Sequence, residues 1–148
     1  MSKTKRVKLF DRIKDDIQSI KKIDIRTKTN NQVYVEYRAL FIQIVHLIHN
    51  LKRTEYNKKE VNQAHVADYL NLSRASVSLN LEKFRLIYLD NSKHGLKTAY
   101  PILKEKYYFM IPENNKKYNR AKEILYLKEL AEKMNNKLAE IIKYNETL

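Results

Sequence analysis

The chain has 148 residues, of which 43% are hydrophobic and 32% charged, which excludes general disorder and predicts one domain with a modest core. Its 30 lysine and arginine residues exceed its 17 acidic residues, giving a formal charge of +13 that favours a polyanionic partner, nucleic acid or anionic membrane. The alternative is a basic protein from a lysine-rich proteome. Because cysteine is absent, and neither a signal peptide nor an apolar run of the roughly 20 residues that span a bilayer is visible, we expect a cytoplasmic protein.

The first periodic segment predicts an amphipathic helix over residues 6–22. Phe10, Ile13, Ile17 and Ile20 recur every three or four residues, so they share one face of a helix. That face has two interpretations, half of a dimerisation layer or a helix packed on the core of its own chain. The pattern fades over residues 23–29, which we interpret as a linker or a short strand.

A second helix is predicted from about Val33 to Lys52, with Asn30 or Asn31 as its N-cap. Its broad apolar surface is typical of a buried central helix. His46 and His49 lie three residues apart, a spacing that could bind a metal. No cysteine and no third clustered ligand accompanies them, so we expect no metal site. A polar loop over residues 52–59 would lead to the next element.

Residues 63–84 predict two short helices joined by a tight turn. Val66, Ala67 and Leu70 fall at helical spacing in the first helix. Ser73 is a good N-cap for the second helix, because its hydroxyl can accept an orphan backbone N–H. The pattern as a whole is Q-x-x-(apolar)-A-x-x-L-x-(apolar)-S-x-x-x-V-S-x-x-L-x-x-(L/F), and it is met by Gln63, Val66, Ala67, Leu70, Leu72, Ser73, Val77, Ser78, Leu81 and Phe84.

This pattern resembles the helix-turn-helix of winged-helix regulators, in particular the MarR family and its SarA-like branch. It is also similar to the TubR-type segregation adaptors of plasmids and phages. The resemblance implies a mainly α fold with a small β-hairpin wing, that is, a winged helix-turn-helix with long N- and C-terminal dimerisation helices. The expected organisation is a single winged-helix domain over residues 1–148, with its core at 33–103.

The second helix of the pair would then be the DNA recognition helix. Arg74 at its start could pair with the O6 and N7 atoms of guanine. Ala75, Ser76 and Leu79 could approach base edges or a thymine methyl group. Phosphate contacts are expected from Gln63, Ser73 and Ser78, and Lys83 and Arg85 are weaker candidates further along the helix.

The segment after Phe84 predicts a β-hairpin, which would form the wing. Two apolar runs, residues 86–89 and 99–103, flank a turn-rich stretch that ends in Gly95. Pro101 in the second run would indicate an edge strand. Lys93, His94 and Lys97 near the tip would lie against DNA phosphates, although lysine is also common at solvated hairpin tips.

The last segment predicts a long helix over residues 117–145. Its apolar residues alternate spacings of three and four, as in a coiled coil: Ile124, Leu127, Ala131, Met134, Leu138 and Ile141. We interpret this helix as a dimerisation element that makes the protein a homodimer. The alternative is a helix that folds back on the first helix of its own chain.

Together these observations predict a homodimeric protein that binds double-stranded DNA sequence-specifically, most simply as a transcriptional regulator. The alternative is a centromere-binding adaptor, or a replication or partition protein of a plasmid or phage, which binds repeated DNA sites and recruits a cytoskeletal NTPase. The sequence has no P-loop, nucleophile motif or recognisable catalytic carboxylate pair. We therefore expect no enzymatic activity and no cofactor.

Overall fold

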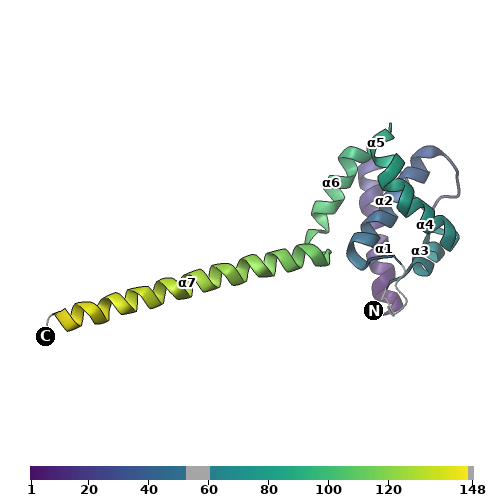
Figure 1. The fold of residues 1–148 in the computed structure, drawn as a ribbon. Coiled ribbons are helices and arrows are strands. Elements are labelled where there is room, and N and C mark those ends of the chain that lie inside the picture. The colour runs from purple at the N-terminus through teal and green to yellow at the C-terminus, as the bar shows by residue number, and fades with distance from the viewer. Residues whose placement is uncertain (53–60, 147–148) are drawn as a thin grey trace. The chain divides into compact units, whose positions relative to one another are not determined.

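The computed structural model describes residues 1–52 and 61–146, apart from the side chains of residues 115–118. The predicted loop over 52–59 thus lies outside the described residues, except for Lys52. The chain divides into two compact units, Met1–Ile111 and Pro112–Leu148, whose elements are drawn in Figure 1. Each unit is considered by itself below.

Helix α1 spans Lys3–Lys21 and packs against α2 through its apolar face. Leu9, Phe10, Ile13 and Ile17 on this face are at most 7% exposed. Ser2 caps the helix by accepting the N–H of Lys5. The apolar face of α1 is therefore covered within its own unit, as the second of its two interpretations required.

Helix α2, Gln32–His49, is the centre of the first unit. Asn31 caps it, and ten consecutive residues from Glu36 to Val45 are buried, as expected of a helix surrounded on all sides. Its buried Arg38 donates to the carbonyl oxygens of Ile25 and Thr29 at 2.8 and 2.9 Å, and to that of Thr27. These bonds hold residues 23–31 as a loop, so the possible short strand in this segment is not formed.

Helices α3, Gln63–Leu70, and α4, Arg74–Lys83, form the predicted helix-turn-helix. Ser73 is the N-cap of α4, as the sequence indicated, and accepts the N–H of Ser76 at 3.0 Å. Phe10, Phe41 and Tyr69 contact one another with ring centroids 5.2–5.6 Å apart. This aromatic cluster joins α1, α2 and α3 into one core.

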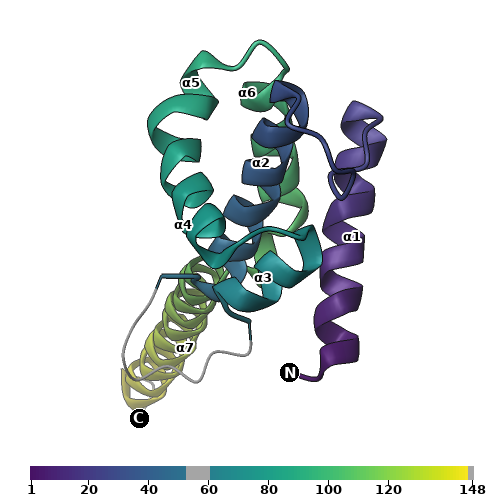
Figure 2. The same ribbon diagram turned by 90° about the vertical axis from the view of Figure 1, so that its right-hand side faces the viewer.

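The predicted β-hairpin wing is wrong, because residues 86–91 and 96–103 are helical and no strand occurs in the part of the chain that the structure describes. After α4 the chain continues through a π-helical turn, Phe84–Tyr88, into α5, Leu89–Asn91. Helix α6, Leu96–Lys106, follows the turn that contains Gly95. Figure 2 shows α4 and α5 as one continuous rod with α6 returning beside α2.

The wing fails because its apolar residues also fit a helical period. Leu96, Ala99, Leu103 and Tyr107 recur at spacings of three and four and are at most 1% exposed, so they form one buried stripe. Gly95 supplies the φ of +81° that starts α6. The turn signal in the sequence was therefore real, but it joins two helices rather than two strands. Pro101 lies inside α6 on its exposed side, not on an edge strand.

The second unit is the long helix α7, Pro112–Glu146, which covers the predicted helix and begins five residues earlier. Pro112 occupies its first position, where a missing N–H costs nothing. The short 3-10 turn Tyr108–Met110 precedes it. Every side chain from Asn119 to Glu146 is exposed. Among the described residues, no helix combines the length and apolar character needed to cross a membrane.

Candidate nucleic-acid interface

Helix α4 is fixed on the core by one face and presents the opposite face outward. Val77, Leu81 and Phe84 are at most 9% exposed, and they pack toward α2 and α3. Arg74, Ala75, Ser78 and Leu79 are exposed, and Ser76 and Lys83 are half-buried on one flank. The predicted recognition residues of α4 thus lie where a DNA groove could reach them.

The start of α4 is electropositive. Its first turn contains no acidic residue, so no carboxylate within that turn offsets the positive end of the helix dipole. Arg74 adds a full charge there and has no ion-pair partner within the described residues. The hydroxyl of Ser73 also donates to the Ser76 hydroxyl at 2.9 Å, so both hydroxyls are held at the helix start.

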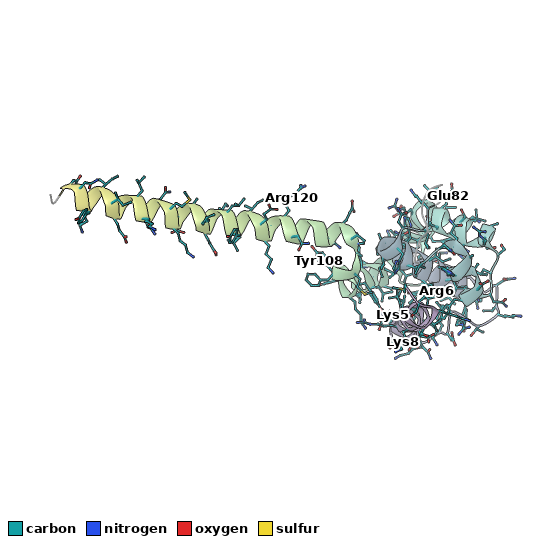
Figure 3. The ribbon with its side chains drawn as sticks, turned by 90° about the horizontal axis from the view of Figure 1, so that it is seen from below. Lys5, Arg6, Lys8, Glu82, Tyr108 and Arg120 are labelled. Atoms are coloured by element: carbon teal, nitrogen blue, oxygen red, sulfur yellow. The ribbon has the colours of Figure 1, made fainter. Side chains whose placement is uncertain are left out.

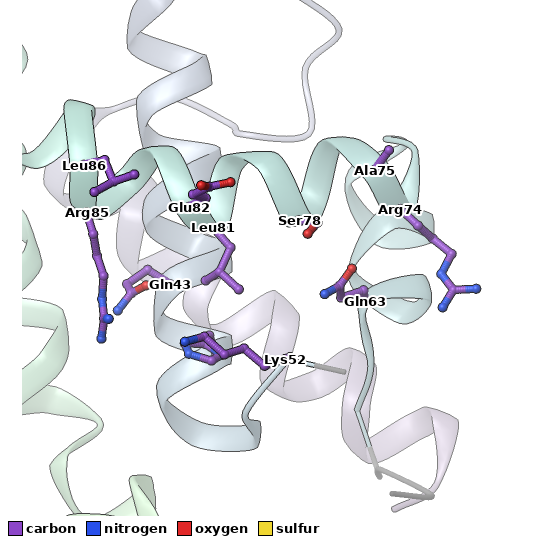
Figure 4. A pocket seen from close by; sticks show the side chains of 11 residues that line it. Gln43, Lys52, Gln63, Arg74, Ala75, Ser78, Leu81, Glu82, Arg85 and Leu86 are labelled. Carbon is purple, nitrogen blue, oxygen red and sulfur yellow. The ribbon is translucent and has the colours of Figure 1, made fainter. Parts of the chain in front are cut away.

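A groove of about 700 Å³ runs along one flank of α4, and we call it the α4 groove (Figure 4). Its walls are α4 with the following π-helical turn on one side, and the C-terminal part of α2 with the start of α3 on the other. The described residues that line it are Gln43, His46, Lys52, Gln63, Arg74, Ala75, Ser78, Leu81, Glu82, Arg85 and Leu86. Four of the predicted DNA-binding residues, Gln63, Arg74, Ala75 and Ser78, are therefore brought together.

Three cations and one acidic residue line this groove. Lys52, Arg74 and Arg85 carry positive charge, and Glu82 is the carboxylate. In the described part of the chain, neither Arg85 nor Glu82 has an ion-pair partner within 4.0 Å. The groove is consequently cationic and suits a negatively charged ligand.

Gln43 is a buried polar residue in the wall of the groove. It is 1% exposed, its Nε2 lies 3.3 Å from the Tyr100 hydroxyl, and its Oε1 has no hydrogen-bond partner among the residues that the structure describes. An unsatisfied buried acceptor costs about 1–3 kcal/mol. Gln63 is held differently, because its Nε2 donates to the carbonyl of Leu51 at 2.9 Å.

Sequence reasoning missed Gln43, Lys52 and Glu82 as groove residues and ranked Arg85 low. Arg74, Ser78 and Arg85 lie at i, i+4 and i+11, so a helical projection of α4 continued past Phe84 would have placed them on one flank. No comparable signal exists for Gln43 and Lys52, because they come from the end of α2 and the segment after it.

The three residues assigned to the wing tip do not join this groove. Residues 74–91 form a helical rod about 25 Å long at 1.5 Å per residue, and Lys93, His94 and Lys97 follow its far end. The imidazole of His94 lies 3.6 Å from the buried Glu36 carboxylate, and its carbonyl accepts the Tyr37 hydroxyl at 2.6 Å. Lys93 and Lys97 are exposed. Their assignment to a wing is wrong because the wing does not exist.

The histidines have structural roles in this unit. His65 closes a capping box with Asn62, accepting its N–H at 3.1 Å, and burial together with the nearby Arg6 lowers the pKa of His65. His46 accepts the N–H of Leu51 through Nδ1 at 2.9 Å. No cluster of three potential metal ligands occurs among the described residues.

We compared the chain with known protein families, curated proteins and solved structures. No protein-family model matches the chain, and no curated protein or solved structure shows significant similarity to it.

Proposed function

We propose that the protein binds double-stranded DNA sequence-specifically through α4 and acts as a transcriptional regulator. The observation that carries the proposal is a helix-turn-helix whose second helix exposes an arginine and small residues at an unneutralised N-terminus. An α-helix fits the major groove, and the first turn of such a helix reads base edges. The excess of basic residues supports a polyanionic partner.

Arg74 is the proposed base-reading residue. Its guanidinium can donate two parallel hydrogen bonds to the O6 and N7 atoms of guanine. Ala75 and Leu79, both exposed on α4, offer methyl groups to a thymine methyl. Recognition by α4 needs no wing, because the helix itself supplies the contacts to bases.

A homodimer is part of the proposal, and α7 is its dimerisation element. All its apolar stripe residues are exposed in the single chain, from Ile124 at 49% to Met134 at 65%. An isolated helix of this kind gains little stability without a second surface. Two copies of the chain would present two α4 helices to two half-sites.

The proposal is tested by measuring affinity for the duplex that the protein selects from a random library. Arg74→Ala should lose about 1–3 kcal/mol of binding free energy and relax the preference at one base pair. Lys93→Ala and Lys97→Ala are matched controls, since each also removes one positive charge, and they should leave the selected motif unchanged. A selected motif that is identical for wild type and Arg74→Ala would refute recognition by α4.

The arrangement of sites in a genome separates a regulator from a segregation or replication adaptor. A regulator predicts single sites upstream of genes. An adaptor predicts one tight cluster of repeats, bound by many copies, next to the gene of its NTPase.

A further inference from the structure

We propose that the α4 groove holds the sugar–phosphate backbone of one DNA strand, with Lys52, Arg85 and Gln43 as contacts. This inference rests on the proposed function and names the part of the DNA that the flank of α4 would contact. These residues would supply the contacts to DNA phosphates that the sequence analysis had assigned to the wing.

The groove has the length that a stretch of backbone requires. Arg74 and Arg85 stand toward its two ends (Figure 4), and their separation of eleven positions corresponds to about 16 Å of helix. Each phosphate of one strand advances about 3.4 Å along the duplex axis. Because the strand also winds around that axis, its phosphates are further apart along the strand than this axial advance, and a short run of phosphates fits between the two guanidinium groups.

The charges in the groove favour a polyanion over a neutral ligand. Lys52 projects from the wall opposite α4, so cations face the groove from both sides. Arg85 is exposed and forms no ion pair within the described residues, so binding a phosphate would break no ion pair among those residues. The Glu82 carboxylate partly offsets these positive charges and would repel the phosphates of a bound strand.

Gln43 supplies the feature that a solvated basic surface would lack. As the amide stands, its Nε2 faces the Tyr100 hydroxyl, and its Oε1 has no partner in the described part of the chain. A half-turn of the amide lets Oε1 accept the proton of the Tyr100 hydroxyl and leaves Nε2 to donate to a phosphate oxygen. A strand in the groove thus satisfies both ends of a buried amide at once.

The first test is the salt dependence of binding to the selected duplex, because each phosphate contact contributes to the slope of log K against log salt concentration. Arg85→Ala and Lys52→Ala should each reduce that slope by about 1 and leave the motif unchanged. Lys8→Ala is the matched control for net charge, since Lys8 lies on the side of the first unit away from Glu82 in Figure 3. Equal slopes for wild type, Arg85→Ala and Lys52→Ala would overturn the inference.

Glu82 gives a test in which the charge changes in the other direction, and Gln43 gives a test of the buried amide. Glu82→Gln removes the opposing carboxylate and should raise affinity severalfold. Gln43→Glu keeps an acceptor for Tyr100 but cannot donate to phosphate, and it should lower affinity at least tenfold while circular dichroism confirms the fold. Unchanged affinity in a folded Gln43→Glu protein would overturn the role of Gln43.

The two proposals fail in different ways. If the wild-type protein selects no motif, the proposed function fails. If Arg74→Ala alters recognition while the variants at positions 43, 52, 82 and 85 behave like Lys8→Ala, DNA recognition by α4 stands and the backbone groove falls.

Discussion

His65 makes the stability of the first unit depend on the protonation state of one side chain. In the capping box its Nδ1 accepts the N–H of Asn62 at 3.1 Å, and only a neutral imidazole can accept there. Burial is the main cause that lowers its pKa, Arg6 adds to it, and Asp68 opposes both. The imidazole is therefore neutral when α3 is capped.

This predicts a pH-dependent stability that resides in His65. The unfolded chain takes up the proton first, at its ordinary pKa near 6.5, so the free energy of unfolding should fall as pH drops below about 6.5 and level off below the folded pKa. His65→Gln preserves a capping-box acceptor that does not titrate. The variant should lack this pH-dependent decrease in the free energy of unfolding. The decrease in the wild type should be on the order of 1 kcal/mol, the typical contribution of a helix cap.

Chemical denaturation between pH 7.5 and pH 5 would check this prediction. Carboxylates that titrate in this range contribute equally to both proteins, so the difference between the two curves isolates His65. Parallel curves for wild type and His65→Gln would contradict the assignment.

Buried polar residues were the part of the molecule least visible in the sequence. Arg38 lies among apolar residues of α2, where a charged residue would ordinarily be expected on the exposed face. It is buried instead and donates hydrogen bonds to three loop carbonyls. Gln43 is as deeply buried. Their hydrogen-bond partners lie in other segments of the chain. The hydrophobic pattern within one segment does not indicate such contacts.

Local chemistry explains which elements could be predicted. The turn between α3 and α4 is specified within ten residues by Ala67, Leu72 and the Ser73 cap, so it was read correctly. The segment after Phe84 has short apolar runs that suit a strand or a helix equally. Its helical form is decided by Leu96, Ala99 and Leu103 packing on α2, a tertiary effect.

Helix α7 carries a prediction about assembly. Leu138 lies in its apolar stripe and Leu125 lies outside it, and their exposed fractions are 56% and 57%. Leu138→Glu should dissociate the proposed dimer, because a charge buried at its seam costs about 2 kcal/mol or more. Leu125→Glu is the matched control and should remain dimeric.

Sedimentation equilibrium of the full chain measures this difference directly. A wild-type monomer at about 100 μM, a concentration at which a Kd of 1 μM would give mostly dimer, would contradict the role given to α7. Equal dissociation by both variants would show that the stripe is not the seam.

At the scale of the whole molecule, a compact helical unit and a long helix share one strongly basic chain. The candidate site combines residues from α2, α3, α4 and the turn after α4. About a third of that lining was predicted from the sequence, namely the part on the helix-turn-helix itself. The remainder depends on how α2 packs against α4, which no motif encodes.

Selection of binding sites from a random duplex library at about 150 mM salt tests the central claim most directly, because non-specific binding is weak at that ionic strength. We expect a defined motif with two half-sites about one helical turn apart. Enrichment of no sequence over the starting library would contradict it, and α4 would then be a solvated helix rather than a recognition helix.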